Sequence, residues 1–340
     1  GQGVIKTFRK EYEKAFATYF QIAQELDETA ARAAAETLIE KVGGLSIRMG
    51  AAEGFGKRIV EAAEEDHRQL VRKAHDYAVA SALKTTERRT YQAMEAFIHN
   101  LNTMNSRAGA QVPFSSINYG TDTSMEGRMV MKNVLLATEA GLGNGETPIF
   151  PIQIFRVKEG INYNAEDPNY DLFRLAMRCS AKRLFPNFSF QDAPYNLKYY
   201  KEGHPETEIA YMGCRTRVIA NVFDPDREIS IGRGNLSFTT INLPRLAIKA
   251  KGDVHIFFED LDRKIDDCVA QLLERFEIQA RKKVRNFPFL MGQHVWLDSE
   301  KLGWDDEIRE IIKHGTLSLG FIGLAETLTA LIGEHHGQSE

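Results

Sequence analysis

Strands that alternate with helices are the feature that most restricts how this chain can fold. The near-continuous apolar run 148–157 predicts a buried strand, Asp167 and Pro168 predict the start of a helix, and 186–190 predicts a short strand. Upstream, the segment 111–120 interleaves apolar and small polar residues, which also predicts a strand. Parallel sheets buried on both faces give this alternation. The sequence therefore predicts an α/β protein from residue 109 onward.

The segments on either side of this region are mostly helical in pattern. Apolar side chains recur at helical spacing through 4–80 and again over 84–105, with a glycine-rich break predicted at 43–56. A long amphipathic helix is predicted over 254–284, and 315–325 predicts a strand that leads into a helix. We therefore divide the chain into a helical lead-in, residues 1–108, and an α/β part, residues 109–340.

Net charge, hydropathy and cysteine content argue against several broad classes of protein. The net charge of the 340 residues is −4, whereas binders of nucleic acid or membrane surfaces usually carry a basic excess. No apolar run reaches the roughly 18 residues that a membrane span needs, and no signal peptide is evident. The three cysteines are far apart and cannot build a zinc ribbon, which favours a reducing, cytoplasmic setting.

One of these cysteines, Cys214, lies in a predicted loop between two strands, within the segment 211–218. Gly213 precedes it, and the nearby Arg215 and Arg217 would favour a thiolate. Composition alone still favours a structural Cys214 slightly over a reactive one. The other two cysteines, Cys179 and Cys268, fall within predicted helices, where a packed and unreactive thiol is the expected state.

Glycine-rich segments are the remaining candidates for ligand binding. Segments 141–145, 232–234 and 320–323 could each bring backbone N–H groups to a phosphate, but none matches a P-loop or dinucleotide fingerprint. The segment 320–323 is best placed, since a strand there meets a helix N-terminus. Tight packing between strand and helix would need the same glycines. No metal site is predicted, because adjacent His335 and His336 point to different helix faces.

Five segments in order resemble the anaerobic (class III, glycyl-radical) ribonucleoside-triphosphate reductases. They are Asn-Leu-Asn-Thr-Met-Asn-Ser-Arg-Ala-Gly-Ala-Gln-Val-Pro-Phe-Ser-Ser-Ile-Asn-Tyr-Gly-Thr-Asp at 100–122, Phe-Pro-Ile-Gln-Ile-Phe at 150–155, Asp-Pro-Asn-Tyr-Asp-Leu-Phe at 167–173, Met-Gly-Cys-Arg-Thr-Arg-Val at 212–218 and the Gly-Thr-Leu-Ser-Leu-Gly-Phe-Ile-Gly-Leu segment within 315–328. The resemblance covers nearly all of the chain from about residue 85 onward. The helices before it match more loosely.

The resemblance implies a ten-stranded α/β barrel with a central finger loop, here incomplete, and it gives two residues a catalytic role. Met-Gly-Cys-Arg-Thr corresponds to the family's finger loop, so Cys214 would become the thiyl radical that abstracts the ribose 3′ hydrogen. Gly-Arg-Gly-Asn corresponds to the segment with the family's active-site asparagine, which implies Asn235. A neutral amide can both donate to and accept from the 2′ and 3′ hydroxyls.

Substrate and effector contacts follow as further expectations of the resemblance. Ser115, Ser116 and Asn118 are candidate contacts for the ribonucleoside triphosphate, with strand-end hydrogen bonding as the equal alternative, and Gly320 and Gly323 are candidates for its triphosphate. The family is a homodimer with a dNTP effector at the dimer interface. The candidate effector residues lie along one side of the helix 84–105, where a solvated polar face is the alternative: Lys84, Arg88, Glu95 and His99.

Several parts of the family have no match in this sequence. These are the N-terminal ATP-binding regulatory domain, a second active-site cysteine, the four-cysteine zinc site and the glycine that carries the radical. The zinc site and the glycyl radical are therefore expected outside this chain, which should not turn over alone. The expected partners are the nucleotide substrate, dNTP and ATP effectors, a radical-SAM activating enzyme and a second copy of the subunit, with no nucleic acid and no membrane.

Two other functions stay open from the residues. A glycyl-radical enzyme of the formate-lyase type would share the barrel and the finger-loop cysteine, but such relatives commonly carry adjacent cysteines, whereas Cys214 has Gly213 and Arg215 beside it. A nucleotide-sensing dimerisation module would use the helices and glycine turns without radical chemistry.

Overall fold

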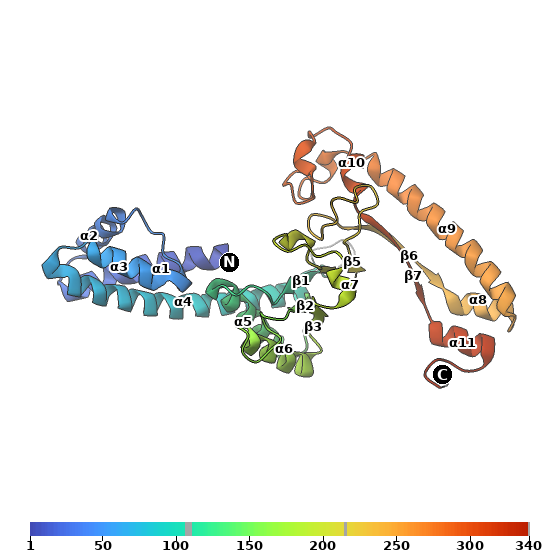
Figure 1. Cartoon of the computed structure of the whole chain (residues 1–340), viewed down its shortest axis with the longest axis horizontal. Helices are drawn as coiled ribbons and strands as arrows, with labels where there is room; N and C mark the ends of the chain where they lie inside the picture. Colours follow the sequence, from blue (N-terminus) through green and yellow to red (C-terminus); the bar gives the residue numbers. More distant parts are fainter. Residues whose placement is uncertain (106–110, 214–215, 339–340) are drawn as a thin grey trace. The chain divides into compact units, whose positions relative to one another are not determined.

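The computed structural model describes residues 1–105, 111–213 and 216–338. The chain divides into two compact units, unit 1 (Gly1–Pro194) and unit 2 (Tyr195–Glu340). Unit 1 contains the N-terminal helices and a three-stranded sheet, and unit 2 contains two two-stranded sheets (Figure 1).

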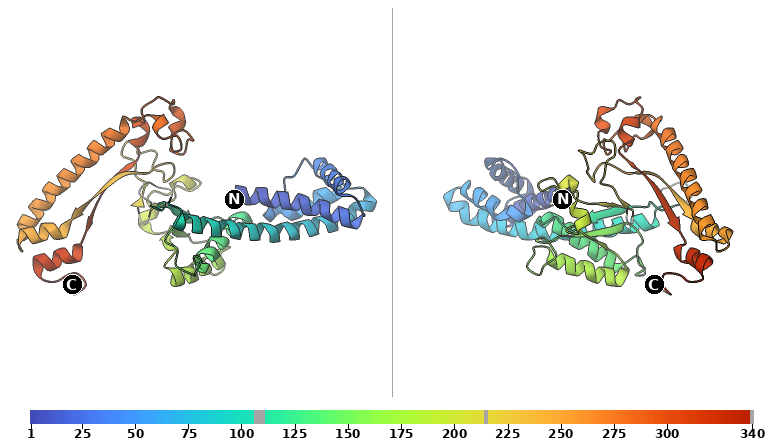
Figure 2. Two further views of the ribbon diagram at one scale, coloured as in Figure 1. Left: turned by 180° about the vertical axis from the view of Figure 1, so that it is seen from behind. Right: turned by 45° about the vertical axis from the view of Figure 1, so that its right-hand side comes forward.

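Unit 1 begins with four helices that pack on one another (Figures 1 and 2). They are α1 (Gln2–Ala23), α2 (Glu28–Lys41), α3 (Ala52–Glu61) and α4 (Arg68–Thr103), with short 3-10 turns at Met49–Ala51 and Glu65–His67. The helical lead-in predicted from the apolar spacing is confirmed.

The core of these helices pairs large side chains with small ones. Phe8, Tyr12 and Phe16 recur one turn apart on α1 and are fully buried, so each removes a large apolar surface from water. Opposite them, α4 presents Ala74 and Ala78, also fully buried, whose small side chains let the helices approach closely. Among the helices that the structure describes, α1 and α4 accordingly form the most extensively packed pair.

A three-stranded parallel sheet follows in unit 1. Its order is β1 (Ser116–Tyr119), β2 (Ile152–Val157) and β3 (Asn187–Phe190), and the crossovers carry α5 (Met125–Ala140) and α6 (Tyr170–Arg183). The two helices and one sheet face enclose a core that includes Phe155 and Leu135, both fully buried. The predicted alternation of parallel strands and helices is confirmed.

Unit 2 contains two small sheets. β4 (Tyr211–Met212) and β5 (Thr216–Arg217) form an antiparallel pair, and β6 (Asn235–Asn242) pairs in parallel with β7 (Thr316–Ile322). Figures 1 and 2 show the long α9 running beside β6 and β7. The helices of this unit are α7 (Pro194–Leu197), α8 (Leu243–Ala250), α9 (Val254–Ala280), α10 (Arg309–Ile312) and α11 (Leu324–Ile332), with 3-10 turns at Pro205–Thr207, Val284–Asn286 and Ser299–Lys301.

The α/β class is confirmed, whereas the ten-stranded barrel stays a prediction. Within the described residues the strands form separate sheets of three, two and two strands, without a closed barrel among them. The boundary predicted at residue 108 also stays a prediction, and the compact units divide after Pro194.

Some predicted helix ends were wrong. No break separates 4–80 from 84–105, since α4 runs unbroken from Arg68 to Thr103. Helix α6 begins at Tyr170 and not at Asp167, because the Asp167 carboxylate instead accepts hydrogen bonds from the N–H groups of Tyr163 and Asn164, at 2.9 and 2.8 Å, and closes the preceding turn. Helix α9 ends at Ala280, before the predicted 284.

Helices that could cross a membrane are not found in the described part of the chain, where none combines the necessary length with the necessary apolar character.

Candidate active site

The segment around Cys214 is bounded by paired strands. Tyr211 pairs with Arg217 and Met212 with Thr216 in an antiparallel ladder, and Gly213 has a φ of 56°, which a glycine adopts without strain. The strands predicted on either side of Cys214 are therefore present. Cys214 and Arg215 themselves lie outside the described residues.

Strand β5, which follows Cys214, contacts α7 through the side chain of Arg217. The Arg217 guanidinium lies 5.2 Å from the centre of the Tyr195 ring and donates to Asn196 Oδ1 at 2.9 Å. The next two residues, Val218 and Ile219, are buried. The hairpin thus leads directly into a packed part of unit 2.

Asn235 is the first residue of β6. Its side chain is exposed, and in the sheet it pairs with Thr316. Paired residues of neighbouring strands share a face and alternate residues return to it, so Asn235, Thr316 and Gly320 lie on one face of the β6–β7 sheet. Helix α9 contacts the opposite face, where Gln271 accepts from Thr239 Oγ1 at 3.2 Å.

The two glycine candidates at the end of β7 differ in how much room they have. A Cβ added at Gly320 would meet only ordinary contacts, the nearest at 3.9 Å. Gly323 has a φ of 75°, and a Cβ there would lie 2.3 Å from Pro244 Cγ. Close packing of α11 against α8 therefore accounts for Gly323 without a ligand. Its role in triphosphate binding, like that of Gly320, stays a prediction.

The substrate candidates of unit 1 lie on or beside β1. Ser116 and Asn118 share one face of the three-stranded sheet, while Ile117 and Tyr119 on the other face pack into apolar clusters. By register the face of Ser116 and Asn118 continues through Ile154 of β2 to polar residues of β3, Asn187 and Ser189. Ser115 precedes the strand, and its hydroxyl donates to the Pro113 carbonyl at 3.3 Å.

Two buried asparagines, which the sequence reasoning did not single out, fix the carboxyl end of β1. Asn162 donates to the carbonyls of Gly120 and Arg156 at 3.0 and 2.9 Å, and Asn169 donates to those of Gly120 and Asp122 at 3.2 and 2.9 Å. Both side chains are fully buried. They satisfy carbonyls that would otherwise be costly to bury. Asn residues clustered in a loop after an apolar strand are the only sequence signal for them.

Another residue missed at the sequence level is Arg233, within Gly-Arg-Gly-Asn. It is buried with 9% of its surface exposed, and its guanidinium donates to four backbone carbonyls. Burial lowers the pKa of this group from its ordinary value. An arginine between two glycines hints at an unusual environment, but the sequence does not say which acceptors it meets.

The remaining cysteines have the environments that were predicted. Cys179 is fully buried between α5 and α6, where its thiol donates to the Leu135 carbonyl at 3.6 Å, and burial raises its pKa to about 11. Such a thiol stays protonated and unreactive near neutral pH. Cys268 is half-buried on α9, against the cluster around α8.

The candidate effector residues form a continuous stripe on α4. Lys84, Arg88 and Glu95 are exposed and His99 is half-buried. The stripe is accessible, as either an effector site or a solvated face would require. The effector role stays a prediction.

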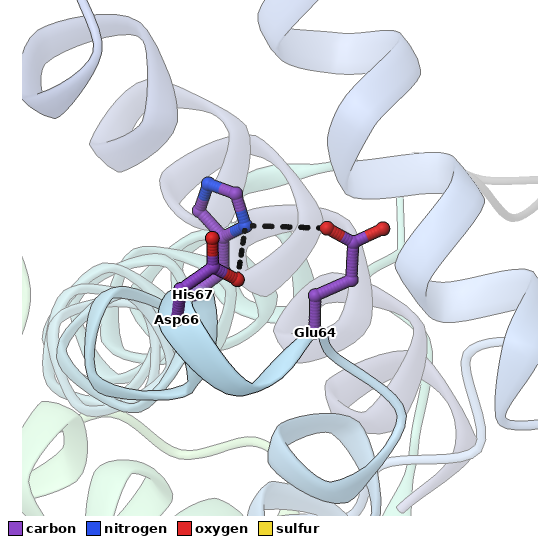
Figure 3. A group of neighbouring side chains, drawn as sticks. All are labelled: Glu64, Asp66 and His67. Carbon is purple, nitrogen blue, oxygen red and sulfur yellow. Dashed lines mark ion pairs between the residues drawn. The ribbon is translucent and has the colours of Figure 1, made fainter.

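One group of three potential metal ligands occurs among the described residues. Glu64, Asp66 and His67 lie together before α4, with His67 Nδ1 at 3.8 Å from the Glu64 carboxylate and at 3.4 Å from that of Asp66 (Figure 3). All three are exposed and close in the chain, so local sequence alone accounts for their proximity. We assign no metal to them.

Comparison with known proteins places the chain in a family. Residues 13–340 match the family model described as "Anaerobic ribonucleoside-triphosphate reductase", and the chain belongs to this family. Relatives of the same name are 34% identical over 258 residues in Salmonella typhimurium, 33% over 266 residues in Escherichia coli and 34% over 276 residues in Enterobacteria phage T4. The resemblance seen in the sequence motifs is confirmed.

The matches cover much of this chain but a smaller part of each relative. They include 75%, 77% and 78% of this chain, yet only 35% of each of the two bacterial proteins and 44% of the phage protein. A solved structure of the anaerobic ribonucleotide reductase from Thermotoga maritima, with citrate in its active site, matches at 11% identity with a TM-score of 0.37, covering 95% of this chain and 64% of that one. The family assignment rests on the sequence matches alone.

Proposed function

We propose that this chain provides the thiyl-radical site of an anaerobic ribonucleoside-triphosphate reductase, which converts ribonucleoside triphosphates to 2′-deoxyribonucleoside triphosphates. The observation that carries the proposal is family membership over 13–340, together with the family's cysteine motif between β4 and β5. In this proposal Cys214 is the thiyl cysteine and Asn235 is its partner at the substrate ribose.

The chemistry assigned to the chain is hydrogen transfer at the ribose. The Cys214 sulfur radical takes the hydrogen from C3′, so that an S–H bond forms and a C3′–H bond breaks, and the 2′ hydroxyl takes up a proton and leaves as water. An external reductant, formate or a thiol, supplies two electrons to the ribose, and the Cys214 thiol returns a hydrogen to C3′, which restores the sulfur radical. Asn235 holds the ribose hydroxyls through its neutral amide, which cannot take a proton from them. A glycyl radical, which we assign to no residue of this chain, supplies the unpaired electron when it is present.

We further propose that the described sheets are parts of the family's ten-stranded barrel. The parallel pairing within β1–β2–β3 and within β6–β7 supports this, as does the exposed position of Asn235 on β6. The polar face that carries Ser116 and Asn118 supports substrate contact there. Gly320 shares the face of Asn235 and has room for a ligand group near its backbone.

The proposed partners follow from the family. The accessible stripe on α4 supports a homodimer contact that holds a dNTP effector at Lys84, Arg88, Glu95 and His99. A radical-SAM enzyme would activate the subunit. A four-cysteine zinc site does not fit this chain, which has three cysteines in all. The comparisons give no support to the formate-lyase alternative or to a non-catalytic nucleotide sensor.

The test uses the full-length subunit with its activating enzyme under anaerobic conditions. Ribonucleoside triphosphates are supplied with formate and, in separate reactions, with a thiol reductant, and deoxyribonucleotide products are measured by chromatography. The proposal predicts 2′-deoxyribonucleoside triphosphates in at least one of the two reactions. Radical formation without any deoxyribonucleotide product under either reductant would contradict it.

A further inference from the structure

Arg233 is tied to three separate segments of unit 2 by its own side chain. Nε donates to the His314 carbonyl at 2.7 Å, Nη1 to the Ile219 and Ile229 carbonyls at 2.9 and 3.0 Å, and Nη2 to the Ala220 carbonyl at 2.7 Å. Ile219 and Ala220 belong to the exit of the Cys214 hairpin, and His314 lies two residues before Thr316, where β7 begins. A single side chain therefore joins the hairpin exit to the strands of the β6–β7 sheet.

The backbone on both sides of Arg233 is fixed as well. The Gly232 carbonyl accepts from the Leu297 N–H at 2.6 Å, and the Gly234 carbonyl accepts from the Thr316 N–H at 2.9 Å. A Cβ at Gly234 would lie 2.8 Å from the Trp296 ring, so the chain approaches that ring as closely as a glycine allows. The guanidinium consequently projects from a rigid base.

A second contact joins the hairpin exit to the segment just before β7. The side chains of Asn221 and His314 are within hydrogen-bonding distance, at 3.1 Å between Asn221 Nδ2 and His314 Nδ1. Asn221 is 4% exposed, and it directly follows the carbonyls that Arg233 binds. Two independent contacts at one junction indicate that the position of the hairpin exit is set there.

Only an arginine suits these acceptors. Its planar guanidinium presents donors in fixed directions, whereas a lysine ammonium is a compact charge that cannot reach four carbonyls on three segments in one plane. Each carbonyl left without a donor in a buried site carries a desolvation cost. Four backbone carbonyls accept hydrogen bonds from this cation, and the negative charge of Glu228 partly offsets the lowering of its pKa by burial.

We propose that Arg233 is a positioning residue, which fixes the exit of the Cys214 hairpin relative to Asn235 at the start of β6. The catalytic consequence rests on the proposed reductase function, while the mechanical link does not. Hydrogen transfer depends steeply on the placement of the reacting groups, so loosening this junction should slow turnover without weakening substrate binding to the same degree.

The chain offers a matched control. Arg183 in unit 1 is 8% exposed and also makes four hydrogen bonds to backbone carbonyls, those of Glu139 (two bonds), Ala140 and Gly145. Those carbonyls all belong to the end of α5 and the turn after it. Arg183→Lys therefore perturbs an equally buried arginine that contacts neither motif of the candidate site.

The experiment compares Arg233→Lys and Arg183→Lys in the full-length, activated subunit. Amide hydrogen exchange followed by mass spectrometry should show exchange at least about tenfold faster in 216–221 and 229–235 for Arg233→Lys only. The kcat of that variant should fall at least about tenfold, with a KM within about threefold of wild type and an unchanged glycyl-radical signal. Arg183→Lys should keep a wild-type kcat.

Three results would overturn the inference. Unchanged exchange in 216–221 and 229–235 would remove the mechanical link. Loss of protection throughout unit 2 would make Arg233 a folding residue without a specific positioning role. An equal fall in kcat for both variants would show a general effect of instability. If the wild-type subunit makes no deoxyribonucleotide, the proposed function fails, and the exchange data alone decide the link.

Discussion

The two buried arginines, Arg183 and Arg233, make the same kind of contact, from a guanidinium to backbone carbonyls, but with different structural consequences. Both make four hydrogen bonds to backbone carbonyls, to three carbonyls from Arg183 and to four from Arg233, and both are more than nine-tenths buried. The acceptors of Arg183 are close together in the chain and terminate α5, whereas the acceptors of Arg233 range from Ile219 to His314. The first arginine completes a helix end, and the second holds distant segments together.

This difference predicts which substitutions should lower activity while the fold stays stable, and which should lower activity only by destabilising the fold. A residue that completes a helix end affects activity only through the stability of the fold. A residue at a junction beside the candidate site can change activity while the fold persists. The predictions below therefore compare changes near Arg233 with changes of similar chemistry elsewhere.

Apart from replacement of Cys214 itself, the largest effect is expected at Asn235. Its side chain is exposed, so Asn235→Ala should change the free energy of unfolding by less than about 0.5 kcal/mol. It should lower kcat by about 10²–10³-fold, because the substrate hydroxyls lose their neutral partner. Steady-state kinetics and urea unfolding measure the two effects.

Asn242 at the other end of β6 provides the control. Its side chain accepts from the Arg245 N–H at 3.2 Å and caps α8. Asn242→Ala should cost about 1 kcal/mol of stability and leave kcat intact. Wild-type turnover in Asn235→Ala would remove that residue from the site.

Replacement of either arginine by alanine should cost a similar amount of stability. Each variant removes four hydrogen bonds from a charged donor to backbone carbonyls, so we expect Arg183→Ala and Arg233→Ala to lose about 2–3 kcal/mol each. Chemical denaturation followed by circular dichroism measures this. A loss confined to Arg233→Ala would show that the two sites are not equivalent structurally, and the comparison between them would fail.

Gly234 and Gly320 should differ in how much an added methyl group destabilises the fold. A Cβ at Gly234 would press on the Trp296 ring, so Gly234→Ala should destabilise by about 1–2 kcal/mol. Gly320 has room for a Cβ, and Gly320→Ala should be neutral for stability within about 0.5 kcal/mol. If Gly320 also contacts the triphosphate, the same variant should raise KM. An unchanged KM would restrict Gly320 to a structural role.

The smallest expected effect depends on pH. The bidentate Arg227 guanidinium, with bonds of 2.6 and 3.0 Å, lowers the pKa of Asp298 to about 2, and Lys301 assists. A carboxylate with a depressed pKa stabilises the fold above its ordinary pKa near 3.8, and this contribution is lost as pH falls toward 2.

Asp298→Asn tests this ion pair. The variant should lose about 0.5–1 kcal/mol at pH 7 and lose less than wild type between pH 4 and pH 2. Urea midpoints across that range measure the difference. Parallel curves for the two proteins would show that the pair contributes nothing to acid stability.

The local parts of the fold could be predicted from the sequence. Phe8, Tyr12 and Phe16 belong to the apolar pattern at helical spacing that predicted the helical lead-in, and α1 forms there. The strand–helix unit β7–α11 was also predicted correctly. These features depend on neighbours within a few residues, which a single sequence displays directly.

The long-range parts could not be predicted. Nothing in the sequence pairs Arg233 with His314, or Asn169 with Gly120, because each contact depends on how distant segments fold back. The helix start at Asp167 was wrong for a local reason, since its carboxylate accepts hydrogen bonds from backbone N–H groups of the preceding turn. The role of Cys214 came from the family motif, since composition slightly favoured a structural thiol.

The most direct test of the account replaces each cysteine in turn in the full-length, activated subunit. Cys214→Ser should abolish deoxyribonucleotide formation, with a loss of at least about a thousandfold, while the glycyl radical still forms. Cys268→Ser, on the half-buried face of α9, should retain wild-type turnover. Deoxyribonucleotide formation at the normal rate by Cys214→Ser would contradict the central claim.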